Sequence, residues 1–275
     1  MNMLASHRGR IWFDLLAAQM TVKEGAVPSL LIGEGELSGR TCSLLLIQPD
    51  ANNRYPRARH GEVGLLEGWA LAEAVSHIVS QEATVEPVHK SAIIAIVDVP
   101  SQAYGRREEA LGIHQALAGA VSAYAQARQG GHPVISLLVG KAMSGAFLAH
   151  GYQANSILAL NDSGVMVHAM GKAAAARITM RSEDALDELA KTVPPMAYDL
   201  KSFATLGLID HFINVSSAIA PSPEDIELVQ RQLVQAVKNL GGDTQITKRL
   251  QGENRGASRL VRERLRAQWK GAAPK

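Results

Sequence analysis

Three short apolar segments in the first half of the chain constrain the fold more than any other feature. Residues 42–48, 91–98 and 133–139 are rich in isoleucine, valine and leucine, and glycine, proline or polar residues bound each segment. This composition is typical of strands that are covered on both faces. Residues 156–160 and 165–168 are shorter candidates, separated by a turn-prone stretch. The sequence therefore predicts a buried sheet.

Helical patterns fill the intervals between these segments. Residues 63–80 carry apolar side chains at a spacing close to 3.6. Residues 106–129 place small residues, among them Gly112, Ala116 and Gly119, along one side. We expect this long helix to pack closely against a sheet or another helix. The alternation of strand and helix predicts an α/β fold built from right-handed βαβ units.

The end of the chain, residues 222–275, is predicted to be a helical, basic extension of a single domain that spans residues 1–275. Ser222, Pro223 and Asp225 form a helix start of the capping-box type, and Gly241 can end that helix. Glu253 and Glu263 are the only acidic residues in the last 28 positions, against nine basic ones: Lys248, Arg249, Arg255, Arg259, Arg262, Arg264, Arg266, Lys270 and Lys275. Two interpretations stay open: a solvated surface helix, or a docking surface for an acidic partner.

Composition excludes several classes of protein. The chain has 275 residues, 47% of them hydrophobic, and one cysteine, Cys42, so a disulfide framework is excluded. No apolar run reaches the ~20 residues that span a bilayer, and residues 1–19 lack a signal-peptide pattern, so we expect a cytoplasmic protein. Nucleic-acid recognition modules, histidines at i and i+4, and phosphate-binding glycine loops are absent from the sequence. We expect no bound metal.

The segment 139–147 is the strongest candidate for chemistry. A strand ends, small residues follow, and a helix is predicted to begin near Ser144. Amides at a helix start are unpaired donors that suit an oxyanion, so the amides of Ser144 and Gly145 are candidates. The segment is otherwise an ordinary strand-to-helix turn. A further alternative makes Ser144 a hydrolase nucleophile with His150 or His168 as base, although the motif Gly-x-Ser-x-Gly is not met.

A second candidate segment, residues 98–105, also follows a predicted strand directly. Loops at the ends of strands in α/β sheets are where ligands usually bind. Since the two candidate segments follow successive strands, we expect them to face one pocket. A plain turn before the next helix is the alternative.

Together these segments resemble the carboxyltransferase branch of the crotonase superfamily. The resemblance lies in Asp98-Val99-Pro100-Ser101, then Glu109, Gly112 and Ile113, then Pro133 and the segment 141–147, and finally Met170-Gly171. It covers roughly residues 61–217, and in detail it is similar to the gamma subunits of biotin-independent malonate decarboxylase. The resemblance implies a single crotonase-like ββα superhelix with helical N- and C-terminal appendages.

The resemblance also implies an activity, partners and site residues. It implies decarboxylation of a malonyl thioester on an acyl carrier protein, giving the acetyl thioester and carbon dioxide. The amides of Ser144 and Gly145 would stabilise the enolate. The implied substrate-binding residues are Pro100, Ser101, Gln102, Met143 and Ala146. The partners would be a homologous beta subunit, the carrier protein and an acyl-carrier transferase subunit.

Biotin is not implied. Ser101 and Ser144 stand where the biotin-using members have glycines, and the biotin-attachment sequence Met-Lys-Met does not occur. We therefore expect no cofactor on this chain. The substrate would be carried on the phosphopantetheine-type prosthetic group of the carrier protein.

Overall fold

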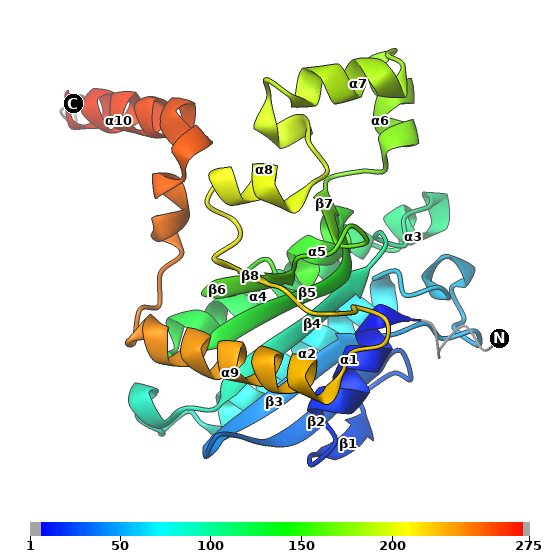
Figure 1. Ribbon diagram of the computed structural model, residues 1–275, viewed down its shortest axis with the longest axis vertical. Coiled ribbons are helices and arrows are strands. Elements are labelled where there is room, and N and C mark those ends of the chain that lie inside the picture. Colours follow the sequence, from blue (N-terminus) through cyan, green and yellow to red (C-terminus); the bar gives the residue numbers. More distant parts are fainter. Residues whose placement is uncertain (1–6, 272–275) are drawn as a thin grey trace.

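The computed structural model describes residues 7–271, and within this range one eight-stranded sheet forms the centre (Figure 1). The strand order is β1-β2-β3-β4-β5-β6-β8, with β7 paired to β5. The first three strands pair antiparallel, and pairing is parallel from β3 onward. The strands are β1 (Thr21–Glu24), β2 (Leu30–Leu37), β3 (Arg40–Ile47), β4 (Ala92–Val99), β5 (Val134–Met143), β6 (Ser156–Leu160), β7 (Met166–His168) and β8 (His211–Ile213).

The predicted strands are confirmed, with one marked difference in length. β3, β4, β6 and β7 lie within two residues of the predicted segments. β5 continues four residues further than predicted, to Met143, because its end pairs with β7. The sequence patterns did not identify β1, β2 and β8. All four residues of β1 are exposed, so no burial pattern marks it.

Helices cover both faces of the sheet. Figure 1 shows α1 (Arg8–Leu16) and α9 (Pro223–Leu240) in front of it, and α2 (Leu65–Gln81) and α4 (Ile113–Gln129) behind it. The N-terminal helix is more than an appendage, because Trp12 and Phe13 are fully buried in the main core. The Trp12 indole N–H donates to the carbonyl of Ala218 at 2.9 Å, which joins the start of the chain to the segment before α9.

The prediction of one long helix over residues 106–129 is wrong in one respect, because this segment forms two helices. α3 (Arg106–Ala110) ends two residues before Gly112, and α4 begins at Ile113. Gly112 has φ +84°, a left-handed conformation that side chains disfavour and that a helix cannot continue through. Gly112 therefore turns the chain between the helices and does not contribute to the small-residue face of α4.

The prediction of close packing by that small-residue face is confirmed. A Cβ atom at Gly68 of α2 would lie 2.7 Å from the backbone carbonyl carbon of Ala116 in α4. The ring of Trp69 lies over Gly119 in the same way, at 2.9 Å from the position of a Cβ atom. The two helices therefore approach each other backbone to backbone.

The C-terminal part is helical as predicted, but part of its charge is internal. Ser222 and Asp225 cap α9 reciprocally, and Gly241 ends it with φ +53°. Arg249 is buried and donates to the carbonyls of Tyr152 and Ala154, so this arginine cannot serve a docking surface. Lys248 pairs with Asp210 at 2.8 Å.

Beyond these residues, α10 (Gly256–Gly271) stands away from the body of the molecule (Figure 1). Lys275 and residues 1–6 lie outside the described residues. The remaining helices are α5 (Ser144–Ala149), α6 (Lys172–Thr179), α7 (Glu183–Ala190) and α8 (Leu200–Thr205). None of the helices within residues 7–271 is both long enough and apolar enough to cross a membrane.

The α2–α4 contact predicts the effect of a one-methyl change. Gly68→Ala removes a helix-destabilising glycine, yet it places a Cβ atom 2.7 Å from the α4 backbone. We expect the forced separation to dominate and to lower the free energy of unfolding by about 1–3 kcal/mol, as overpacked cores do. Urea unfolding followed by circular dichroism measures this. Gly256→Ala, where no atom lies within 4 Å of the added Cβ, is the matched control and should not destabilise. Equal stability of both variants would contradict the close-packing argument.

Candidate active site

A buried carboxylate shapes the end of β5, where the candidate segment begins. In the β4–β5 pairing, Val97 lies opposite Leu138, but Val99 lies opposite Ala142, so β5 bulges between them. The Asp98 carboxylate accepts from the amide of Lys141 in this bulge, at 3.0 Å. Beyond the bulge β5 leaves its partner β6 and pairs with β7. The bulge thereby directs the start of α5 toward β7.

The same carboxylate explains Gly140 and the position of α1. A Cβ atom at Gly140 would lie 2.0 Å from Asp98 Oδ1, so any side chain there would displace the carboxylate. The other oxygen, Oδ2, accepts from the amide of Gly9 in α1 at 3.1 Å. Gly140 is therefore required by Asp98, and close approach of a substrate is not needed to explain it.

Ser144 begins α5 in an uncommon conformation. Its φ is +57°, in the left-handed region that residues other than glycine seldom adopt. Its hydroxyl donates to the carbonyl of Ala169 at 2.7 Å, which joins the start of α5 to the segment after β7. The hydroxyl therefore has a structural acceptor.

Gln102 and Gly145 bring the two candidate segments together. The Gly145 amide donates to the side-chain oxygen of Gln102 at 3.0 Å. Hydrogen bonds with Val63 hold the backbone around Gln102: the Val63 amide donates to Ser101, and the Ala103 amide donates to Val63. Sequence reasoning predicted that the two segments face one pocket, and the structure places Gln102, Ser144 and Gly145 around one cavity.

This cavity has a volume of about 350 Å³ and mostly apolar walls. Aromatic and aliphatic side chains make most of the wall, together with the polar residues Gln102, Ser144, Tyr152 and His168. The lining residues are Gln102, Ser144, Gly145, Phe147, Leu148, Tyr152, Val167, His168, Ala169, Phe203 and Leu208. An apolar cavity with a few convergent polar groups is the usual form of a small-molecule site.

The other four predicted substrate-binding residues do not line this cavity. Met143 and Ala146 are buried in the core, with 4% and 0% of their surface exposed. Ser101 uses its carbonyl to hold Val63, and Pro100 precedes it on the way out of β4. Conversely, the patterns missed Tyr152, Phe203 and Leu208. Phe203 and Leu208 come from a segment far along the chain, and nothing local in the sequence marks any of the three as a neighbour of Gly145.

The hydrolase alternative requires a histidine bonded to the Ser144 hydroxyl, but this hydroxyl donates to Ala169, and neither His150 nor His168 is bonded to it. His150 is fully buried, with Nδ1 at 3.0 Å from the Tyr124 hydroxyl and Nε2 at 3.0 Å from the Ile96 carbonyl. Because both nitrogens are engaged, His150 cannot accept a proton from Ser144. His168 lines the cavity and stacks on Tyr198, with 3.8 Å between ring centroids. Burial lowers the pKa of His168, and its Nδ1 contacts the backbone of Met170.

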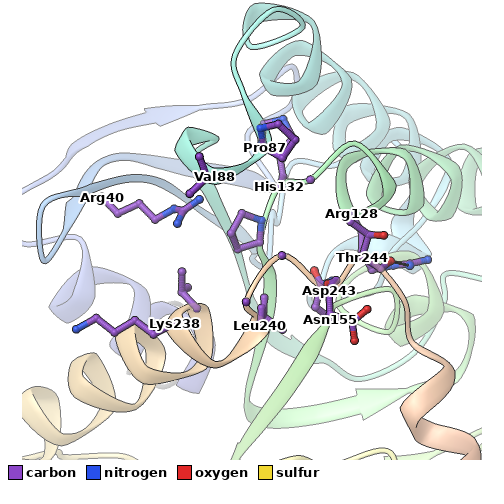
Figure 2. Close-up of a pocket in the computed structure, with 15 residues that line it drawn as sticks. Arg40, Pro87, Val88, Arg128, His132, Asn155, Lys238, Leu240, Asp243 and Thr244 are labelled. Atoms are coloured by element: carbon purple, nitrogen blue, oxygen red, sulfur yellow. Dashed lines mark hydrogen bonds between the residues drawn. The ribbon is translucent and has the colours of Figure 1, made fainter.

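Another cavity, of about 370 Å³, lies between the end of α9 and the C-terminal end of α4 (Figure 2). Two of its polar side chains hold the neighbouring backbone. Arg128 donates to the carbonyls of Gln153 and Thr244, and Asn155 donates to the carbonyl of Asp243. These bonds fasten the loop after α9, and none of the predicted site residues lines this cavity. Among the residues that the structure describes, no group of three potential metal-ligating side chains occurs.

The fold of the chain is also found in a distantly similar protein of known structure. The chain is similar in structure to transcarboxylase 12S, with a TM-score of 0.61 at 20% identity, over 83% of this chain and 41% of that one. This likeness concerns the fold alone. The chain therefore has the fold that the resemblance in the sequence predicted.

The family follows from closer matches. The sequence model of the malonate decarboxylase gamma subunit matches residues 58–269, and the chain belongs to this family. A Pseudomonas malonate decarboxylase hetero-tetramer in complex with coenzyme A contains a chain 55% identical, with a TM-score of 0.89 over 96% of this chain and 100% of that one. The corresponding chain of a Pseudomonas MdcD-MdcE hetero-dimer is 55% identical, with a TM-score of 0.86 over 95% and 99%.

A curated relative is more distant. The malonyl-S-ACP:biotin-protein carboxyltransferase of Malonomonas rubra is 32% identical over 188 residues, which are 68% of this chain. The match spans 64% of the length of that relative.

His150 predicts how stability depends on pH. Burial lowers the pKa of His150 to about 4, below the value of about 6.5 of an unfolded histidine. Between these values the unfolded chain binds the extra proton, so the free energy of unfolding should fall as pH drops, by up to about 1.4 kcal/mol per pH unit from this residue. Urea unfolding between pH 7 and pH 4.5 measures this slope. His150→Gln should flatten it, whatever its effect on stability at pH 7. An unchanged slope in His150→Gln would contradict the burial of a neutral imidazole.

Proposed function

We propose that this chain is one half of a decarboxylase active site. Paired with a homologous beta subunit, it converts malonyl-S-acyl carrier protein, with uptake of one proton, to acetyl-S-acyl carrier protein and carbon dioxide. The observation that carries the proposal is the amide of Gly145, directed at the carbonyl-type oxygen of Gln102 inside an apolar cavity. Family membership and the malonyl-S-ACP substrate in the name of the Malonomonas relative support the choice of substrate.

The Gly145 amide supplies the main chemical contribution of this chain. Loss of the carboxylate leaves an enolate, whose negative charge lies largely on the thioester oxygen. The side-chain oxygen of Gln102 stands where that thioester oxygen would bind, and a flexible glutamine can move aside. An oxyanion donor of this kind lowers the activation free energy by about 3 kcal/mol. The Ser144 hydroxyl keeps its bond to Ala169 and so positions the amide beside it.

The apolar walls favour the same reaction. A carboxylate that enters a cavity lined by Phe147, Val167 and Leu208 loses much of its hydration. Desolvation disfavours the charged group, whereas the carbon dioxide that leaves is neutral. Together with one oxyanion donor, the cavity therefore favours release of the carboxyl carbon over its retention.

The beta subunit is proposed to cover the cavity. Leu148, which lines it, is 48% exposed, and Tyr104 and Leu111 on the neighbouring segment are 57% and 54% exposed. Exposed apolar side chains at the rim of a site suit a protein partner. The MdcD-MdcE hetero-dimer of Pseudomonas supports such an assembly. The carrier protein and the acyl-carrier transferase are the further partners we propose.

The chain itself is proposed to hold no cofactor, and the substrate arrives on the prosthetic group of the carrier. Ser144 adds bulk to the cavity at a position where the resemblance to biotin-using carboxyltransferases implies a glycine. The hydroxyl of Ser144 is fixed by Ala169, so this bulk cannot easily turn away from the site.

Two substitutions separate oxyanion stabilisation from nucleophilic catalysis. Gly145→Val places a Cβ atom 2.1 Å from Gln102 Oε1 and should lower turnover of malonyl thioester about 100-fold or more. Ser144→Ala keeps the backbone amides and should retain turnover within about tenfold. The assay uses the complex assembled with the beta subunit. A loss of ~10⁴-fold in Ser144→Ala, the scale of a missing nucleophile, would instead favour a serine hydrolase.

The half-site proposal predicts that activity requires the pair. The isolated chain should hydrolyse neither esters nor thioesters and should not decarboxylate malonyl thioester, because its cavity stays open on one side. Co-expression with the beta subunit should give a stable, active complex that buries about 2,000 Å² or more. Both preparations are assayed with an ester and with a malonyl thioester. Robust hydrolysis by the isolated chain would refute the subunit assignment.

A further inference from the structure

A cluster of arginines outside the cavity has no role in the proposed chemistry. It combines two segments that are far apart in the sequence, and we call it the arginine face. Its members are Arg54, Arg57, Arg59, Arg106 and Arg107, of which only Arg59 is half-buried and the others are exposed. Within residues 7–271, none of the five comes within 4 Å of a carboxylate oxygen, although nine ion pairs form elsewhere.

The arginine face is built on a buried tyrosine. The Tyr55 side chain is 4% exposed, and the guanidinium carbons of Arg54 and Arg107 lie 4.8 and 5.2 Å from the centre of its ring. One ring thus orients guanidinium groups from both segments through cation–π contacts. Tyr55 and Ala58 belong to a small core cluster with Ala103, the residue that follows Gln102. The arginine face and the segment that contains Gln102 therefore pack on the same core cluster.

The arginine face lies close to the cavity. Gln102, which lines the cavity, precedes Arg106 by four residues, so the two Cα atoms lie at most about 14 Å apart. Arg57 reaches this segment too, because its side chain lies beside Gly105. A macromolecule that binds this face would stand next to the Gln102 side of the cavity.

Five guanidinium groups that form no ion pair within residues 7–271 can bind an external anion. The buried Glu108 carboxylate and the Arg57 side chain both lie beside Gly105, so Glu108 offsets part of the positive charge, but this one carboxylate does not balance five guanidinium groups. Guanidinium groups bind carboxylates through paired hydrogen bonds, and exposed charges steer an oppositely charged partner during encounter. A negatively charged protein surface meets both conditions.

The basic C-terminal segment fits a different role. Arg249 is buried, and Arg255 and Arg259 donate to backbone carbonyls of neighbouring segments. The exposed part, α10, mixes its charges with exposed apolar side chains, namely Leu260, Val261, Leu265 and Trp269. Such a mixture is suited to a lasting subunit interface, whereas a face made of arginines is suited to a partner that binds and leaves.

We propose that the arginine face is the docking surface for the acidic carrier protein that presents the malonyl thioester. The proposal rests on the proposed function and adds the place where the carrier binds. Contacts form between carboxylates of the carrier and the guanidinium groups, and they bring the prosthetic group to the Gln102 side of the cavity. Binding is therefore sensitive to salt, and the chemistry itself does not depend on these arginines.

The test reverses charge at two arginines that have no hydrogen-bond partner within the described residues, in Arg57→Glu/Arg106→Glu. The complex with the beta subunit is assayed with malonyl-carrier protein and with malonyl-pantetheine, which lacks both the protein and the phosphate. At low salt the double variant should raise KM for malonyl-carrier about tenfold or more, with kcat unchanged. KM for malonyl-pantetheine should stay at the wild-type value. Added salt should raise KM of the wild type far more than KM of the variant.

The matched control is Arg231→Glu on α9, an exposed arginine whose pair with Glu227 is solvent-exposed and weak. It should leave both KM values unchanged. If charge reversal disturbs folding, the neutral double variant Arg57→Gln/Arg106→Gln replaces it. This variant should raise KM for malonyl-carrier by a smaller factor. Co-purification with the beta subunit checks that the variants still assemble.

Several outcomes would overturn the proposal. An unchanged KM for malonyl-carrier in the double variant would refute it, and so would loss of assembly, which would make the face a subunit interface. An equal rise in KM for malonyl-pantetheine would show that the arginines shape the cavity. If KM for malonyl-coenzyme A rises as much as KM for malonyl-carrier, the face binds a phosphate and not the protein. A wild-type complex inactive on every malonyl thioester would instead refute the proposed function.

Discussion

The arrangement of the candidate site depends on the hydrogen bonds of one buried carboxylate, Asp98. A carboxylate that is 8% exposed needs donors to replace water, and here they are backbone amides from β5 and α1. A regular parallel pairing of β4 and β5 could not supply these amides, so β5 bulges opposite Asp98. Before the bulge β5 pairs with β6, and after it β5 pairs with β7. The start of α5, with Ser144 and Gly145, takes its direction from this exchange.

The rest of the molecule closes around this arrangement from both ends of the chain. α1 reaches the core with Trp12 and Phe13, and its Gly9 amide completes the environment of Asp98. From the other end, Arg249 binds the backbone of Tyr152 and Ala154 behind the cavity. The cavity therefore depends on terminal segments that no local pattern connects with it.

Two kinds of surface surround the cavity, and their chemistry separates their roles. Exposed apolar side chains such as Leu148 suit a partner that stays bound, because they remain unfavourably hydrated in its absence. The arginine face remains well hydrated when free, so it suits a partner that exchanges at every turnover. The proposed function needs both properties, and this chain keeps them on different residues.

The sequence by itself determined the parts of this protein that depend on neighbouring residues. Burial of the strands, the reciprocal cap of Ser222 and Asp225, and the placement of Ser144 at a helix start follow from periodicity and local backbone preferences. The sequence also predicted that the segments of Gln102 and Gly145 face one pocket, since segments that follow successive parallel strands meet at one sheet edge, and the two residues are in contact. Only the tertiary structure decided which distant residues complete the site. Phe203 and Leu208 line the cavity, Arg249 is buried and Arg106 faces solvent because of contacts between segments 50 to 100 residues apart, and such contacts leave no periodic mark in the sequence.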